Sequence, residues 1–332
     1  MKKLAVIRFS ALGDIAMTVP VVYDLAVQYP DLEITMLSRK MAEPLFEQMP
    51  DNVHFFAADL EGRHKGLLGL CRLWRDARLN EVDYIADFHN VLRTFWLRTE
   101  GCLHRKKIAK IDKGRREKQA LTRQHHKVLT QQASSFERYA KVLEKLGFPT
   151  KPAFEKLDYS EYRELVKQPD EKWIGIAPFA KHEAKMYPIE RMEQVVRALG
   201  ERPCTTIFLF GGGKEEDLQI QRLCGNFENV KSAHSQYGLR GELALMEQLD
   251  VMLSMDSANM HLASLVGTRV VSIWGGTHPY AGFLGWGQNY TDSVQLDLPC
   301  RPCSVFGNKP CLRGDYACLT GITPEQIVEK LL

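Results

Sequence analysis

The chain alternates short apolar strands with amphipathic helices, and this alternation runs through the sequence twice. In the first half it predicts strands at residues 4–9, 33–37 and 82–87, with helices at 15–29, 67–79, from about 90, and at 134–146. In the second half it predicts strands at 173–177, 205–210, 251–254 and 270–274, with helices at 189–199, 215–223 and 257–266. Such alternation is typical of a parallel sheet covered by helices. We therefore predict an α/β fold built from two Rossmann-like halves.

A stretch without a clear apolar face separates the two halves. Residues 150–171 contain prolines and charges, so we expect a linker here between domains at 1–160 and 161–332. The length of 332 residues agrees, because one hydrophobic core seldom organises so long a chain. Thr323 fits an N-cap with Pro324 at the first helical position, which predicts a last helix at 323–332. This helix could fold back onto the first domain.

Composition excludes several classes of protein. Apolar residues make up 45% of the chain and charged residues 26%, which are ordinary globular values. No apolar run approaches the roughly 20 residues of a membrane span. The apolar run near the N-terminus is too short for a secretory signal, so we expect a cytoplasmic protein.

The net charge of +3 conceals one strong asymmetry. Residues 103–128, the basic segment, contain ten lysines or arginines against two acids, Asp112 and Glu117. This segment is either a solvated surface or a surface that attracts a phosphorylated, acidic glycolipid, because each lysine or arginine near an anionic membrane contributes about 1 kcal/mol. The second alternative predicts peripheral association with the membrane.

Loops that leave the strands are the places to look for a ligand site, because ligands bind beyond the carboxyl ends of parallel strands. After the first strand, the loop Ser10-Ala11-Leu12-Gly13-Asp14 combines small residues with a carboxylate. Gly13 allows close approach of the backbone to a ligand, and Asp14 is a candidate general base. An acid at a helix start is about as often only a cap, and the two roles are compatible.

Three loops of the second half suit a nucleotide. Lys185 precedes a helix and could hold phosphate, although a lone loop lysine is often only solvated. Glu216 follows glycines 211–213 and could accept hydrogen bonds from a ribose, or simply favour the helix dipole. Asp256-Ser257 ends a strand where helix amides could hold a diphosphate, or forms an ordinary N-cap. His261 lies inside that helix and fits a packed residue better than a proton carrier.

Taken in order, these loops resemble glycosyltransferase family 9, the lipopolysaccharide heptosyltransferases. Phe179, Tyr187 and Ser257-Ala258 depart from the usual motifs, so another nucleotide sugar is the alternative donor. The resemblance covers nearly the whole chain and lies in Ser10-Ala11-Leu12-Gly13-Asp14, Pro178-Phe179-Ala180 with Lys185-x-Tyr187-Pro188, Asp256-Ser257-Ala258 with His261-Leu262-Ala263, Trp274-Gly275-Gly276-Thr277-His278-Pro279, and the tail from Pro299-Cys300 to Gln326.

The resemblance implies a GT-B architecture, in which two Rossmann-like domains face each other across a cleft. It implies an ADP-activated heptose as donor on the C-terminal side and a phosphorylated glycolipid of the lipopolysaccharide inner core as acceptor on the N-terminal side. By matched motif, Asp14 would be the catalytic base. The donor would contact Ala180, Lys181, Lys185, Gly212, Glu216, Asp256, Ser257, Ala258 and His261, and the acceptor would contact Ser10, Gly13, Asn90 and Arg93.

The implied reaction is a direct displacement that inverts the anomeric centre. Asp14 would take the acceptor proton, while Lys185 and helix-terminal amides would stabilise the departing diphosphate. The chain contains no Asp-x-Asp triplet, so nothing in the sequence suggests a metal-bridged diphosphate, and no cofactor is expected to be required.

Four of the eight cysteines cluster near the C-terminus. Cys300, Cys303, Cys311 and Cys318 lie within nineteen residues. We expect a structural role for them, with a Cys₄ zinc clip and free thiols packed as small apolar groups as the alternatives.

Two other functions compete less well with the sequence. A nicotinamide oxidoreductase would share the strand–helix repeats, but the first loop lacks Gly-x-Gly-x-x-Gly. A nucleic-acid-binding protein would account for the basic segment and the cysteines, but no recognised motif joins them, and we expect no nucleic-acid partner.

Overall fold

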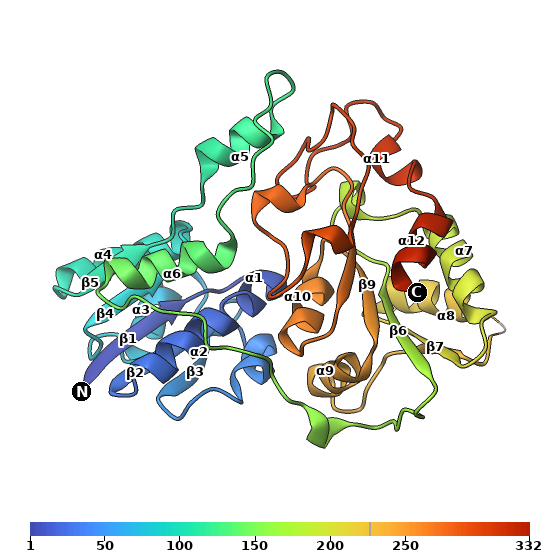
Figure 1. The fold of residues 1–332 in the computed structure, drawn as a ribbon. Helices are drawn as coiled ribbons and strands as arrows, with labels where there is room; N and C mark the ends of the chain where they lie inside the picture. Colours follow the sequence, from blue (N-terminus) through green and yellow to red (C-terminus); the bar gives the residue numbers. More distant parts are fainter. Residues whose placement is uncertain (226) are drawn as a thin grey trace. The chain divides into compact units, whose positions relative to one another are not determined.

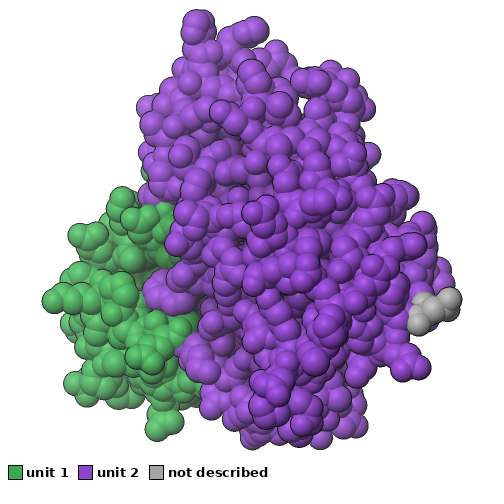
Figure 2. All heavy atoms as spheres, turned by 45° about the vertical axis from the view of Figure 1, so that its right-hand side comes forward, with its two compact units in different colours: residues 1–113, 134–155 green, residues 114–133, 156–332 purple. Residues whose placement is uncertain are grey.

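Two parallel sheets flanked by helices make up the chain (Figure 1). The structure is a computed structural model that describes residues 1–225 and 227–332. It divides into two units, coloured separately in Figure 2. Unit 1 comprises Met1–Lys113 and Ser134–Glu155, and unit 2 comprises Gly114–Ala133 and Lys156–Leu332.

Unit 1 contains a five-stranded sheet in the order β3-β2-β1-β4-β5. Helices α3 and α4 pack on one face through a core that includes Leu70, Leu73 and Leu97, and α2 contacts α6. The strands are β1 (Lys2–Ile7), β2 (Leu32–Ser38), β3 (Val53–Ala57), β4 (Tyr84–Asp87) and β5 (Lys107–Lys110), and the helices are α1 (Leu12–Ala16), α2 (Val19–Gln28), the 3₁₀ helix η1 (Lys40–Phe46), α3 (Gly66–Asp76), α4 (Leu92–Leu103) and α6 (Ser135–Lys145).

Unit 2 contains a six-stranded sheet in the order β11-β10-β9-β6-β7-β8. Its strands are β6 (Lys172–Ala177), β7 (Thr205–Leu209), β8 (Val230–Ser232), β9 (Val251–Met255), β10 (Val270–Ile273) and β11 (Ser293–Val294). Its α-helices are α5 (Arg115–Thr122), α7 (Ile189–Gly200), α8 (Lys214–Cys224), α9 (Leu239–Gln248), α10 (Ala258–Leu265), α11 (Ala317–Thr320) and α12 (Pro324–Leu331). Short 3₁₀ turns are η2 (Ser160–Tyr162), η3 (Glu183–Lys185), η4 (Pro279–Ala281) and η5 (Tyr290–Asp292).

The strand register brings the predicted loops together within each unit. In unit 1, Ile7 of β1 pairs with Asp87 of β4, so the loops that follow these two strands leave the sheet side by side. In unit 2, Ala177 of β6 pairs with Ser254 of β9, which places the Lys185 and Asp256 loops next to each other. Each unit therefore has one ligand-facing edge at the carboxyl ends of its central strands.

The observed division differs from a single cut at residue 160. The change of unit after Glu155 falls inside the expected linker, but residues 114–133 group with unit 2. Tertiary contacts explain this grouping, because the Lys118 ammonium lies 4.0 Å from the centre of the Phe283 ring and the Gln132 N–H donates to the Tyr280 carbonyl at 3.0 Å. Such contacts have no local sequence signal.

Helix α12 is anchored within its own unit, unit 2. It packs on α7, and its buried Ile327 and Leu331 belong to the core of unit 2. The Tyr187 hydroxyl secures the preceding turn by donating to the Ile322 carbonyl at 2.9 Å. The predicted start is confirmed, since the Thr323 hydroxyl accepts the Gln326 N–H in a capping box.

Candidate active site

Asp14 lies in the first turn of α1, at the edge of unit 1 where β1 ends. Its Oδ2 accepts the Ala11 N–H at 3.1 Å, so the carboxylate does serve as a helix-start partner. The adjoining Gly13 is buried in the same turn. The cap uses only Oδ2 of the carboxylate, so Asp14 can still act as a general base through Oδ1.

A buried arginine holds the same carboxylate. Arg8 Nη2 lies 2.6 Å from Asp14 Oδ2, and Arg8 Nη1 donates to the Phe88 carbonyl at 2.8 Å. The Arg8 side chain is 9% exposed and the Asp14 side chain 33%. In the described part of the chain, Oδ1 of Asp14 has no hydrogen-bond partner. The carboxylate is thus clamped through Oδ2, and its second oxygen is available to accept a proton.

Ser10 is oriented by a histidine from the neighbouring strand exit. The Phe9 N–H donates to His89 Nδ1 at 3.4 Å, which puts the proton of the neutral ring on Nε2. His89 Nε2 lies 3.2 Å from Ser10 Oγ and therefore donates to it. Burial and then the charge of Arg8 lower the pKa of His89 to about 4, so the ring is neutral near pH 7. The Ser10 hydroxyl keeps its own proton for another partner.

The predicted acceptor residues Asn90 and Arg93 follow β4. Asp87 Oδ1 accepts the N–H groups of His89 and Asn90 at 2.9 and 2.7 Å, which shapes the turn. The Asn90 side chain donates to the Ile111 carbonyl at 3.1 Å and accepts from Arg98 at 3.0 Å. Asn90 therefore supports the loop through its side chain, while Arg93 lies half-exposed in the first turn of α4.

In unit 2 the structure brings Lys185 and Asp256 together. Lys185 Nζ lies 2.8 Å from Asp256 Oδ2 and donates to the Asp256 carbonyl at 3.1 Å. The Lys185 side chain is 15% exposed and the Asp256 side chain 5%. A Cβ on Gly307 would come within 2.6 Å of Lys185 Cγ, so this glycine makes room for the lysine stem. A buried carboxylate therefore holds an ammonium that is itself only slightly exposed.

The start of α10 lies directly after Asp256. Ser257 occupies the N-cap position but makes no side-chain cap, because its Oγ pairs with Ser254 Oγ at 3.2 Å. The amides of the first turn, beginning at Ala258, are therefore not capped by this side chain and point away from the helix, as anion sites require. His261 is buried in the body of the helix, as expected for a packed residue.

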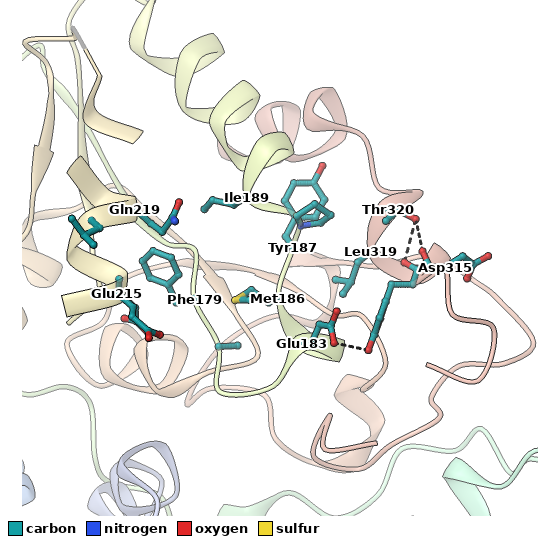
Figure 3. Close-up of a pocket in the computed structure, with 15 residues that line it drawn as sticks. Phe179, Glu183, Met186, Tyr187, Ile189, Glu215, Gln219, Asp315, Leu319 and Thr320 are labelled. Carbon is teal, nitrogen blue, oxygen red and sulfur yellow. Dashed lines mark hydrogen bonds between the residues drawn. The ribbon is translucent and has the colours of Figure 1, made fainter. Parts of the chain in front are cut away.

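A cavity of about 800 Å³ opens beside these loops in unit 2 (Figure 3). Two predicted donor residues, Ala180 and Glu216, line it. Glu216 Oε2 accepts the Gly212 N–H at 2.9 Å, which ties the glycine loop to α8. Lys181 and Gly212 are exposed nearby in sequence but do not line the cavity.

The cavity also has walls that sequence reasoning missed. In Figure 3, Phe179 and Glu215 lie on one side, and Leu319 and Thr320 on the other. Its carboxylates, Glu183, Glu215, Glu216 and Asp315, have no lysine or arginine among the lining residues, so the cavity suits hydroxyl or amino donors better than phosphate. The remaining lining residues are Met186, Tyr187, Pro188, Ile189, Leu218, Gln219 and Tyr316.

Comparison with known proteins decides the family. The profile of glycosyltransferase family 9 (heptosyltransferase) matches residues 70–310, well over half of the chain. The chain belongs to this glycosyltransferase family. It is 24% identical to lipooligosaccharide heptosyltransferase 2 of Campylobacter jejuni, over 96% of this chain and 94% of that protein.

Solved structures show the same fold for this family 9 chain. The family 9 glycosyltransferase of Veillonella parvula matches with a TM-score of 0.73 at 19% identity, covering 99% of this chain and 96% of that one. Heptosyltransferase WaaC of E. coli, solved with ADP, matches with a TM-score of 0.67 at 17% identity over the whole of both chains. These likenesses confirm the predicted GT-B fold of two Rossmann-like units. None of the described helices is long and apolar enough to cross a membrane.

The four cysteines near the C-terminus of this family 9 enzyme are not arranged as a metal site in the part of the chain that the structure describes. Among residues 1–225 and 227–332, no three His, Cys, Asp or Glu side chains are grouped so that they could hold a metal ion. All eight cysteines are free thiols. Burial raises the pKa of Cys318 to about 11, and its side chain joins the core of unit 2. Cys318 thus acts as a small apolar group, and the Cys303 thiol lies 3.6 Å from the Gly276 carbonyl.

Proposed function

We propose that this enzyme transfers heptose from ADP-heptose to a hydroxyl of the lipopolysaccharide inner core, with inversion at the anomeric carbon. The observation that carries the proposal is the Asp14 carboxylate, which is clamped by Arg8 through Oδ2 while Oδ1 is left to accept a proton. The family match supports glycosyl transfer. The ADP bound to the WaaC neighbour, and the name of the Campylobacter relative, support this donor and this class of acceptor.

The donor would bind to unit 2. Lys185 would exchange part of its contact with Asp256 for the diphosphate, and the amides at Ser257 and Ala258 would hold the same anion. Glu216 and the carboxylate-lined cavity suit the hydroxyl and amino groups of a nucleoside. Ala180, Lys181 and Gly212 would complete the contacts from the loops, and His261 would support them from within α10.

The acceptor would bind to the edge of unit 1. Ser10 and Gly13 lie in the loop that carries Asp14, and Asn90 and Arg93 follow the neighbouring strand β4. All four would position the sugar. Asp14 Oδ1 takes the proton of the acceptor hydroxyl as its oxygen forms a bond to the anomeric carbon. The bond from that carbon to the diphosphate oxygen breaks, and its electron pair leaves with ADP. Lys185 and the helix amides stabilise this developing charge.

Positively charged groups of the protein can stabilise the departing diphosphate, as a divalent metal does in many sugar transferases. Lys185 and the start of α10 supply positive charge where the diphosphate would leave, so we propose that transfer requires no metal cofactor. Turnover should then persist in the presence of EDTA. Loss of turnover in EDTA that Mg²⁺ restores would contradict this part of the proposal.

We place the enzyme in the cytoplasm, at the inner face of the membrane that carries the acceptor. Eight free thiols agree with a reducing compartment. The basic segment supports attraction to phosphorylated lipid through exposed residues such as Arg115, Arg116 and Arg123. Not all of its charges are available, because Lys118 lies over the Phe283 ring and Lys127 Nζ donates to the Pro302 carbonyl at 2.9 Å.

A panel of nucleotide sugars tests the donor, and a transfer assay tests the reaction. ADP-heptose at a hundred times its Kd should stabilise the protein by about 2.7 kcal/mol, whereas UDP- and GDP-sugars at the same concentration should not. Any stabilising donor is then incubated with heptose-deficient core glycolipid, and the product mass is measured. Stabilisation by a different nucleotide sugar would favour the alternative donor. Stabilisation by none, with no product, would overturn the proposal.

A further inference from the structure

Two neighbouring helices of unit 1 expose an unusual number of large apolar side chains. Leu67 and Leu68 in the first turn of α3 are 69% and 76% exposed, and Leu92 and Phe95 in the first turn of α4 are 87% and 58% exposed. These four side chains are called the apolar rim. The opposite faces of both helices are buried in one shared core. The rim is therefore a second apolar surface, which the fold does not use.

The rim lies at the substrate edge of unit 1. Helix α3 follows β3 and helix α4 follows β4, and all strands of this sheet are parallel. Because the two helices pack on the same face and start where parallel strands end, their first turns share one edge of the sheet. Asp14 follows β1 at that same edge. Four strongly exposed apolar groups of unit 1 thus lie at the same sheet edge as the loops proposed to bind the acceptor.

The exposed charge on the outer face of α3 is basic. Arg72 and Arg75 are exposed on the outer face of α3, one and two turns after the rim. The only acid of α3, Asp76, is paired with Arg63 at 2.6 Å. The only acid of α4, Glu100, is partly buried. Exposed apolar side chains followed along the helix by exposed arginines are typical of a surface that enters the interface of an anionic membrane.

We infer that the apolar rim inserts into the interface of an anionic lipid bilayer and docks the acceptor edge of unit 1 against it. The inference rests on the proposed function, because a glycolipid acceptor keeps its lipid in the bilayer while its sugar must reach Asp14. A second copy of the chain is a poorer occupant. A self-contact through this surface would gather Arg72 and Arg75 of both copies, all positively charged, at one interface.

Vesicle sedimentation tests the inference with the full chain. Wild type should co-sediment with vesicles of phosphatidylglycerol and phosphatidylcholine in equal parts, and more weakly with phosphatidylcholine alone. The variant L67S/L68S/L92S/F95S should lose about tenfold or more of its binding to the anionic vesicles, because each buried apolar group contributes to interfacial binding. V166S/L312S is the matched control, since Val166 and Leu312 are 84% and 70% exposed in unit 2. The control should bind as wild type does.

A second readout separates this inference from the proposed function. Transfer to a short, lipid-free acceptor should be the same in wild type and in the rim variant, because none of the four residues belongs to the proposed substrate contacts. R72E/R75E should also weaken binding to anionic vesicles while leaving binding to neutral ones unchanged. Failure of wild type to bind vesicles, or unchanged binding by the rim variant, would overturn the inference. So would a concentration-dependent dimer that the rim variant abolishes. Absence of transfer to the lipid-free acceptor would instead count against the proposed function.

Discussion

The two units hold opposite charges at their ligand-facing edges by the same device. In unit 1 a buried cation, Arg8, holds a more exposed acid, Asp14, at 2.6 Å. In unit 2 a buried acid, Asp256, holds a more exposed cation, Lys185, at 2.8 Å. The more exposed member of each pair, called the exposed group below, follows a central strand of its sheet. The inverted polarity means that unit 1 offers a proton acceptor to solvent and unit 2 offers a positive charge.

This inversion fits the two halves of a glycosyl transfer. An attacking hydroxyl must lose a proton, and a departing diphosphate must find positive charge. In each pair the buried partner holds the exposed group in one position. Substitution of either the exposed group or its buried partner therefore tests the role assigned to each pair.

Removal of the exposed acid should have the largest effect. Asp14→Asn keeps the shape of the side chain and the cap to the Ala11 N–H can be re-formed through its carbonyl oxygen, but the base is lost. We expect kcat to fall by about 10² to 10⁴, which is what general base catalysis usually contributes. Initial rates of heptose transfer at saturating donor and acceptor measure this. Turnover within a few-fold of wild type would remove Asp14 from the catalytic role.

Removal of the exposed cation should come next. Lys185→Met should slow transfer by about 10², because one preorganised donor to the leaving group is lost. It should also destabilise the free protein by about 3 kcal/mol, because Asp256 is left buried without its partner. The double variant Lys185→Met with Asp256→Asn is the control, since it should recover stability in urea unfolding but not the rate. Recovery of both would show that Lys185 acts only as a structural partner.

Removal of the buried cation should lower the rate of transfer less. Arg8→Met leaves Asp14 in place but releases its Oδ2, so we expect a roughly tenfold lower kcat with little change in KM for the donor. Arg8→Lys should restore part of the rate because it keeps the charge. A variant that loses donor affinity as strongly as turnover would contradict a positioning role in unit 1.

The smallest effect concerns two histidines, one in each unit. Burial lowers the pKa of His89 and of His278 from 6.5 to about 4. As pH falls, the unfolded chain gains these protons before the folded chain does, so the stability from both neutral rings is complete above about pH 6.5 and is lost towards pH 4. Thermal unfolding between these values should show the decline. His89→Gln should flatten it for unit 1, and an unchanged slope would mean that His89 is already charged in the folded state.

The central strands were predictable from sequence, but the edge strands were not. β1, β4, β6, β7, β9 and β10 are apolar runs buried on both faces, which is the pattern of a parallel sheet. β5 has the sequence Lys-Ile-Ala-Lys, with a charge at each end, and β3, Val-His-Phe-Phe-Ala, is apolar but only partly buried and interrupted by a histidine. Edge strands have only one neighbouring strand and are less buried, so their sequences are shorter or less uniformly apolar than those of central strands.

The sequence predicted which loops carry the candidate site, but not the ion pairs that those loops form. Asp14 and Lys185 could be named because they follow strands, where ligands bind. Asp256 could be named for the same reason, but its pairing with Lys185 could not, and Arg8 was not named at all, because both pairings depend on burial that only the packed structure reveals. The cavity wall from Asp315 to Thr320 lies about a hundred residues from the loops that it faces, and no local pattern in the sequence connects them.

The division of labour between the units is tested most directly by the affinity for ADP-heptose in matched variants. Isothermal titration of ADP-heptose into wild type, Asp14→Asn and Lys185→Met compares the two exposed groups in one experiment. The Kd of Asp14→Asn should equal that of wild type, although its turnover is lost, and the Kd of Lys185→Met should be about tenfold or more weaker, since a charged contact to the diphosphate is removed. An Asp14→Asn variant that loses donor affinity as Lys185→Met does would contradict the account, because both exposed groups would then serve the donor.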